Sequence, residues 1–79
     1  MNTIQEQWIS FEALVVPKNA HKVQRQEMRR AFYAGAEAMI RIQFQVSDES
    51  ISEDAGVAIL EGCRDEMKIF CEQVQNGKA

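Results

Sequence analysis

The residues of this chain that are best suited to do chemistry are basic, and they recur at helical spacing. Intervals of four, three and four residues separate the members of one row, which are Lys18, Lys22, Arg25 and Arg29, with Arg30 beside them. Residues spaced in this way share one face of a helix. Because guanidinium groups bind phosphates through paired hydrogen bonds, the face predicts a site for an anionic ligand.

We predict that the ligand site consists of four basic side chains and one aromatic ring, namely Lys22, Arg25, Arg29, Arg30 and Tyr33. The free amides at the start of the helix would add to the positive field. Tyr33, or alternatively Trp8, could stack on a base. The partners that fit such a site are a nucleotide-like anion and an acidic protein.

The charge distribution leaves a second interpretation open. The net charge is −3, yet residues 18–30 sum to +4 and residues 47–79 to −5. The basic face could therefore pair with acids late in the same chain (Asp65, Glu66 and Glu72) and fix the register of two helices. Duplex nucleic acid is the less favoured partner, because the total charge is negative and the basic patch is small.

Catalysis finds little support in the sequence. His21 is the single histidine, and Cys63 and Cys71 lie eight residues apart on one expected helix, too far apart to form a disulfide. We expect both thiols to act as small apolar groups that are buried or half-buried. The remaining candidates are carboxylates on expected helix surfaces, namely Glu37, Glu61, Asp65 and Glu66. We therefore expect no catalytic residue, metal site or cofactor, and a protein that is not an enzyme.

The apolar pattern predicts three helices, over residues 4–15, 20–46 and 52–75. Thr3 and Glu6 form a capping box for the first helix, and Pro17 ends it. Asn19 is the expected N-cap of the second helix. Either Ser52 or a box of Ser50 with Glu53 caps the third helix, and Gly77 is expected to end it.

The second helix has two apolar stripes. The main seam is spaced 4-3-4-3-4 and consists of Met28, Phe32, Gly35, Met39, Ile42 and Val46. The second stripe consists of Tyr33, Ala36, Ile40 and Phe44. Since short loops make sequential helices antiparallel, we expect an all-α single domain, 1–79, in which a short N-terminal helix packs on a long antiparallel hairpin.

A glycine at the centre of the second helix suggests a close approach. Gly35 costs the helix ~1 kcal/mol relative to alanine, and we expect Trp8 or Phe70 to press on the backbone there. The alternative is that Gly35 and its alanine neighbours form the floor of a ligand pocket.

The first helix is too short to cover the whole hairpin. At about 18 Å it cannot reach the far end, so we expect an exposed apolar patch there that forms the interface of a homo-oligomer, most simply a dimer. The predicted interface residues are Ile40, Phe44, Ile51, Val57 and Ile59.

The chain has no apolar run of membrane-spanning length and does not start with a charged and apolar leader. We expect a cytoplasmic protein that does not enter a membrane.

The stretch VVPKNAHKVQRQEMRRAFYAGAEAM resembles a group of small proteins encoded by phages and prophages. In that group a Val-x-Pro element precedes Gln-x-x-x-Met-Arg-x-Ala-Phe-Tyr-Ala-Gly-Ala. The matching residues here are Val15 or Val16, Pro17, Gln24 or Gln26, Met28, Arg29 or Arg30, and 31–36. The resemblance implies a phage accessory protein in the host cytoplasm. By analogy, it would antagonise host defence by sequestering a nucleotide signal or blocking a defence protein. The alternative is a nucleic-acid-binding or regulatory accessory protein.

Overall fold

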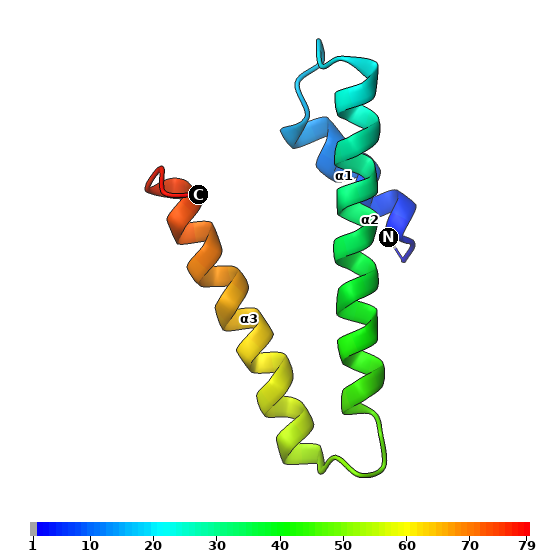
Figure 1. Cartoon of the computed structure of the whole chain (residues 1–79), viewed down its shortest axis with the longest axis vertical. Coiled ribbons are helices and arrows are strands. Elements are labelled where there is room, and N and C mark those ends of the chain that lie inside the picture. The colour runs from blue at the N-terminus through cyan, green and yellow to red at the C-terminus, as the bar shows by residue number, and fades with distance from the viewer. Residues whose placement is uncertain (1) are drawn as a thin grey trace. The chain divides into compact units, whose positions relative to one another are not determined.

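The computed structural model describes residues 2–79, which contain three α-helices (Figure 1). They are α1 (Ile4–Val15), α2 (Lys22–Val46) and α3 (Glu53–Gln75). No strand occurs among the described residues, so the predicted all-α class is confirmed. None of the described helices combines the length and the apolar composition needed to cross a membrane.

Helix α1 begins and ends where the sequence predicts. The Thr3 hydroxyl accepts a hydrogen bond from the Glu6 amide at 3.1 Å, and the Thr3 amide donates to the Glu6 carboxylate at 3.3 Å. These two bonds complete the predicted capping box. Val16 is extended and precedes Pro17, as expected of a residue whose helical conformation a following proline disfavours.

Helix α2 begins at Lys22 rather than at Ala20, so the prediction that Asn19 caps it is wrong. The Ala20 amide donates to the Pro17 carbonyl at 3.0 Å and closes a tight turn over residues 17–20. Asn19 lies within this turn and not at the start of the helix. The ring of His21 takes over the capping role, because its Nδ1 accepts a hydrogen bond from the Val23 amide at 3.2 Å.

Helix α3 is capped at both ends by local interactions. Ser52 is the N-cap, and its hydroxyl accepts from the Ala55 amide at 3.1 Å, so the first of the two predicted caps is the one that forms. At the other end Gly77 has a φ of +71°, and the next amide, that of Lys78, donates to the Gln73 carbonyl at 2.8 Å. This Schellman-type ending confirms the predicted role of Gly77.

The turn between α2 and α3 is organised by Asp48. Its carboxylate accepts hydrogen bonds from the amide and the hydroxyl of Ser50, at 2.8 and 2.7 Å. Both bonds lower the pKa of the Asp48 carboxyl below its usual value, and the bond from the Ser50 amide has the larger effect. Asp48 thus keeps its negative charge directly after α2.

The chain divides into two compact units, Met1–Arg41 and Ile42–Ala79, with the boundary inside α2. Each unit is described by itself. The antiparallel hairpin and the single domain over residues 1–79 stay predictions, as does the pairing of the basic face with the acids of α3.

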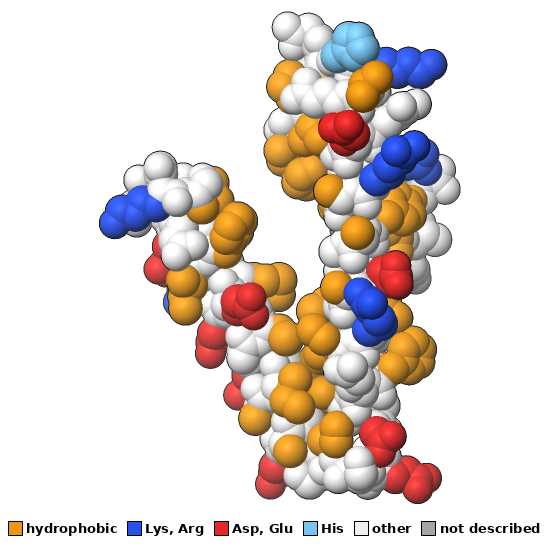
Figure 2. Space-filling view, in the orientation of Figure 1, with side chains coloured by type: hydrophobic (Ala, Val, Ile, Leu, Met, Phe, Trp, Pro, Cys, Tyr) orange, Lys and Arg blue, Asp and Glu red, His pale blue; other side chains and the backbone are white. Residues whose placement is uncertain are grey.

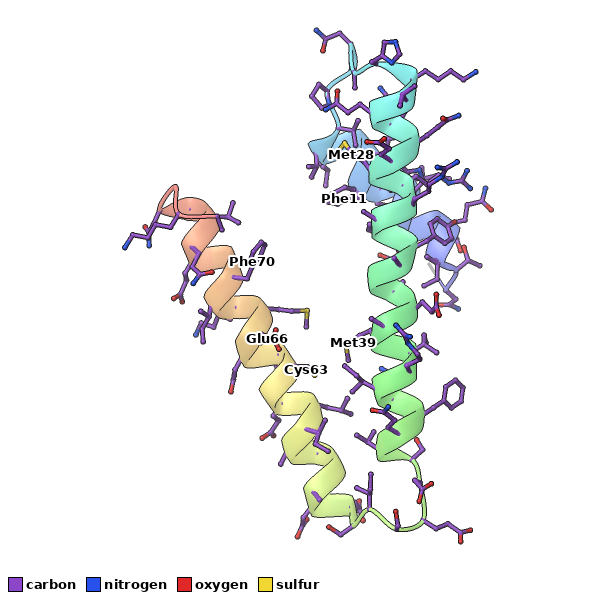
Figure 3. The ribbon with its side chains drawn as sticks, viewed as in Figure 1. Phe11, Met28, Met39, Cys63, Glu66 and Phe70 are labelled. Carbon is purple, nitrogen blue, oxygen red and sulfur yellow. The ribbon has the colours of Figure 1, made fainter. Side chains whose placement is uncertain are left out.

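The first unit is held together by aromatic rings from α1 and α2. The ring centroids of Trp8 and Phe32 are 5.5 Å apart, those of Phe11 and Phe32 5.2 Å, and those of Trp8 and Phe11 5.8 Å. Figure 3 places Phe11 on the side where α1 crosses the N-terminal half of α2. Trp8 is only 5% exposed. These contacts fasten α1 to α2, because aromatic rings at 4.5–7 Å combine large buried area with favourable edge contacts.

The apolar residues of α1 differ in burial, because Trp8 and Phe11 pack on α2 whereas those at the end of the helix do not. Leu14 is 87% exposed and Val15 is also exposed, whereas Val16, just beyond the helix, is buried. The extended conformation of Val16 ends the helical periodicity. The helical periodicity of α1 therefore does not predict the direction of the Val16 side chain.

In the second unit α3 meets the end of α2 at a glycine. A Cβ built on Gly56 would lie 3.4 Å from the Val46 carbonyl oxygen and 3.5 Å from the Val46 Cβ, which is van der Waals contact. Farther along α3 large apolar side chains are exposed, and Figure 2 shows apolar groups along much of its length. They are Val57, Ile59, Met67, Ile69, Phe70 and Val74.

The expectation that Trp8 presses on the backbone at Gly35 is wrong, and the approach of Phe70 stays a prediction. Among the described residues, a Cβ built on Gly35 would meet no atom within 4 Å. The residue is exposed in the middle of a regular helix, so the Trp8 ring of the same unit does not press on its backbone.

Removing the Trp8 ring is expected to destabilise the protein severely. Trp8→Ala should lower the free energy of unfolding by about 3–5 kcal/mol, because it empties the centre of the aromatic cluster. Leu14→Ala is the matched control, since Leu14 is on the same helix but almost fully exposed. Its effect should stay within about 0.5 kcal/mol. Urea unfolding followed by circular dichroism measures both changes, and equal effects would contradict the described core.

Gly35→Ala is expected to stabilise α2 by about 0.5–1 kcal/mol, because alanine is the better helix former and the added methyl group meets open space. Gly62→Ala in α3 has the same open surroundings and should give a gain of similar size. Thermal unfolding measures both. A loss of stability for Gly35→Ala alone would show that another helix does approach this position.

Candidate functional site

The basic residues of α2 form a shallow site centred on Arg29. The Arg29 guanidinium carbon lies 5.4 Å from the centre of the Tyr33 ring, within cation–π range. An open hollow is lined by these two residues together with Gln26 and Arg30. Figure 2 shows several Lys and Arg side chains along the first unit. The site thus has two guanidinium groups, one amide and one aromatic ring.

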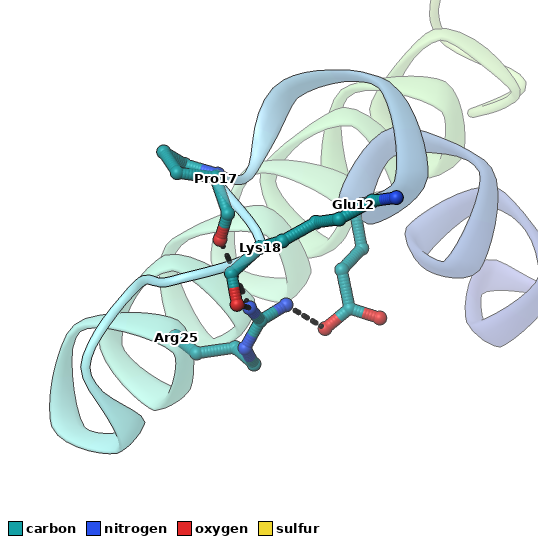
Figure 4. A network of polar contacts seen from close by, with 4 residues as sticks. All are labelled: Glu12, Pro17, Lys18 and Arg25. Atoms are coloured by element: carbon teal, nitrogen blue, oxygen red, sulfur yellow. Dashed lines mark hydrogen bonds and ion pairs between the residues drawn. The ribbon is translucent and has the colours of Figure 1, made fainter.

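Arg25, although on the predicted basic face, is already engaged within the protein (Figure 4). Its guanidinium forms an ion pair with the Glu12 carboxylate at 2.9 Å and donates to the Pro17 carbonyl at 3.0 Å. A longer contact of 3.5 Å reaches the Lys18 carbonyl. Arg25 therefore joins α1, the loop and α2, and contacts within the protein already use up to three of its five N–H donors.

Lys22 lines a neighbouring hollow between α1 and α2. The lining residues are Gln5, Trp8, Ile9, Glu12, Lys22, Arg25, Gln26 and Arg29. Glu12 places a carboxylate in this hollow, which makes it less favourable for an anion, whereas the described lining of the hollow at Tyr33 includes no acid. The structure therefore groups Arg29, Arg30 and Tyr33 around one hollow, while Lys22 and Arg25 line the neighbouring hollow, which Arg29 also borders.

The aromatic partner for a base can be assigned more narrowly than from the sequence. Trp8 borders the hollow at Lys22, but it is only 5% exposed, so little of its ring is free to stack on a ligand. Tyr33 is half-buried, with its centroid 6.4 Å from that of Phe32 and with Arg29 over its ring. The flat face available for stacking on a ligand is thus the face of the Arg29 guanidinium that points away from the Tyr33 ring.

Two features of the site were missed by the sequence analysis. The ion pair between Glu12 and Arg25 joins two helices through a turn, and no spacing rule connects residues 13 apart across a proline. Gln26 lines both hollows and carries no charge that would have drawn attention to it. Its place one turn before Arg30 was the only available signal.

The cysteines differ from one another. Cys63 is half-buried, as expected, but Cys71 is exposed. Within residues 2–79 no cluster of three or more His, Cys, Asp and Glu side chains is arranged to hold a metal ion.

The predicted interface residues are mostly exposed. Phe44 is 75% exposed, Val57 50%, Ile40 45% and Ile59 43%, while Ile51 is intermediate. Exposure is what an interface requires of these residues, and the homo-oligomer stays a prediction.

Comparisons of the chain with protein-family models, with curated proteins and with solved structures gave no match.

The link between Arg25 and Glu12 is expected to be measurable as a coupling. A double-mutant cycle with Glu12→Gln and Arg25→Gln should give a coupling free energy of about 0.5–1 kcal/mol. The value is modest because both side chains are about one-third exposed and water screens the pair. Arg25→Lys should lose most of the stability that Arg25→Gln loses. A lysine ammonium cannot donate to the Glu12 carboxylate and to the Pro17 carbonyl at once, as the planar guanidinium does. Lys22→Ala is the control and should change the unfolding free energy by less than about 0.5 kcal/mol. Additive single effects would contradict the ion pair.

Proposed function

We propose that this protein is a non-enzymatic binding protein that takes an anionic, nucleotide-like ligand at Arg29, Arg30 and Tyr33. The observation that carries the proposal is the Arg29 guanidinium held over the Tyr33 ring, in a hollow that Arg30 also lines and whose described lining holds no acid. Two guanidinium groups side by side suit a phosphate or diphosphate.

The orientation of Arg29 supports a ligand that also contains a ring. A guanidinium stacked on an aromatic ring loses part of its freedom before binding, so less entropy is lost on ligand capture. Its outer face can stack on a base while its edge donates hydrogen bonds. Gln26 adds an amide that can both donate and accept.

We further propose, from the resemblance to small phage proteins, that the role of this binding is to counter host defence by removing a nucleotide signal. If the protein instead blocks a defence protein, it would bind this charged partner through the same basic face or through the acidic α3. Neither of these two modes of action requires a catalytic group, a metal or a cofactor.

Binding is tested by thermal shift and calorimetry with cyclic dinucleotides and ADP-ribose-type molecules. A ligand that binds only the folded protein raises the melting temperature. Arg29→Ala and Arg30→Ala should each weaken the binding by about tenfold or more, because a charged hydrogen bond is lost. Arg64→Ala, an exposed arginine on α3, is the matched control and should leave the affinity unchanged.

The outcomes separate the alternatives. A salt-dependent gel shift with duplex DNA, without a response to nucleotides, would favour a nucleic-acid-binding accessory protein. Equal affinity of the Arg29 and Arg64 variants for a bound nucleotide would place the site elsewhere.

A further inference from the structure

The hollow at Tyr33 adjoins the hollow at Lys22, because two residues of α2 line both of them. These residues are Gln26 and Arg29, and both hollows lie in the same unit, Met1–Arg41. The volumes of the hollows are about 390 and 380 Å³, each within the range of small-molecule sites. Helix α2 rises by about 16 Å from Lys22 to Tyr33, so the two hollows together offer more room than one phosphate group needs.

The hollow at Lys22 has a mixed lining. Three of its lining residues, Lys22, Arg25 and Arg29, are positively charged, and Glu12 is negatively charged. Arg25 pairs with Glu12 at 2.9 Å, which leaves Lys22 and Arg29 as the cations without an ion pair to that acid. The lining also includes the apolar side chain of Ile9, which is 53% exposed. This lining suits a neutral group with an apolar edge that is attached to a negatively charged group.

The carboxylate of Glu12 has one oxygen left for a ligand. Its Oε2 accepts the hydrogen bond from Arg25, and Figure 4 shows the other oxygen pointing away from the guanidinium. The Glu12 side chain is 31% exposed and lines the hollow, so a ligand placed there can reach it. Because a carboxylate only accepts hydrogen bonds, the ligand group that meets this oxygen must donate one.

Ribose is the part of a nucleotide that has such a donor close to a phosphate. Its 2′-hydroxyl donates to aspartate or glutamate carboxylates in dinucleotide-binding sites, and the carbon atoms of the sugar ring can contact Ile9. A second phosphate in the same place would lie against the Glu12 carboxylate and be repelled. A deoxyribose would lack the hydroxyl and leave the carboxylate oxygen without a donor from the ligand.

We infer that the two hollows form one site for a ribonucleotide. The phosphate lies at Arg29 and Arg30, and the ribose lies in the adjoining hollow, where its 2′-hydroxyl donates to Oε1 of Glu12. Gln26 and Arg29 line the boundary between these two parts of the site. The inference rests on the proposed function and deepens it, because it names the sugar of the ligand and a residue that selects it.

The contact with ribose is tested by calorimetry with matched ligands. ADP and 2′-deoxy-ADP form one pair, and cyclic di-AMP and its 2′-deoxy form are the other. In a pair that binds, the wild-type protein should bind the ribonucleotide about five- to tenfold more tightly than the deoxyribonucleotide. The reason is that a hydrogen bond to a charged group is lost together with the 2′-hydroxyl.

Three variants separate this contact from the structural role of the ion pair. Glu12→Ala should bring the ratio of the two affinities close to one. Arg25→Gln removes the same ion pair but keeps the carboxylate, so it should retain the preference for ribose. Glu27→Ala is the matched control, because it removes an exposed acid of α2 that lines neither hollow, and it should leave both affinities unchanged. Circular dichroism confirms that each variant keeps its helices.

The inference and the proposed function can fail separately. Equal affinity for both members of a pair, with binding that still depends on Arg29, would refute the contact with ribose and leave the proposed function intact. An unchanged ratio in Glu12→Ala, or an equal loss of the ratio in Arg25→Gln, would also overturn the contact. Binding of none of the four ligands would overturn the inference and count against the proposed function as well.

Discussion

The packing of Trp8 and Phe11 on Phe32 is the interaction on which the first unit of this protein depends. Trp8 is one of only two large apolar side chains that are buried among residues 2–79, the other being Val16. The cluster holds α1 against one side of α2, and the pair of Arg25 with Glu12 fixes the same contact at its edge. Without it α1 would have few apolar contacts, and a helix of 12 residues is marginal in water by itself.

The different roles of the residues along α2 follow from the packing of α1 on this helix. The side that faces α1 supplies Phe32 to the core and Arg25 to the polar edge, so these residues serve the structure. The neighbouring side is left to Arg29, Arg30 and Tyr33, which line an open hollow. A binding site placed there needs no rearrangement of the core, which favours a protein that presents a preformed surface.

The core of this chain is small, and much of its apolar surface is exposed. A chain of 79 residues buries a limited fraction of its surface, and here most large apolar side chains of α3 are exposed. Covering them would add ~25 cal/mol for each Å² of apolar surface removed from water.

The sequence by itself determined the helices. The Thr3 box, Pro17, Ser52 and Gly77 act through bonds to near neighbours, and their effects follow from local spacing. The start of α2 was the exception, because the turn at Pro17 and the His21 ring displaced the expected cap. The tertiary structure alone decided which arginines are tied to the rest of the fold. The ion pair of Arg25 with Glu12 depends on how α1 crosses α2, and Arg29, one turn farther along, lies instead over Tyr33. Residues with the same charge and the same helical face therefore acquire different roles, because only folding determines which of them meets a carboxylate.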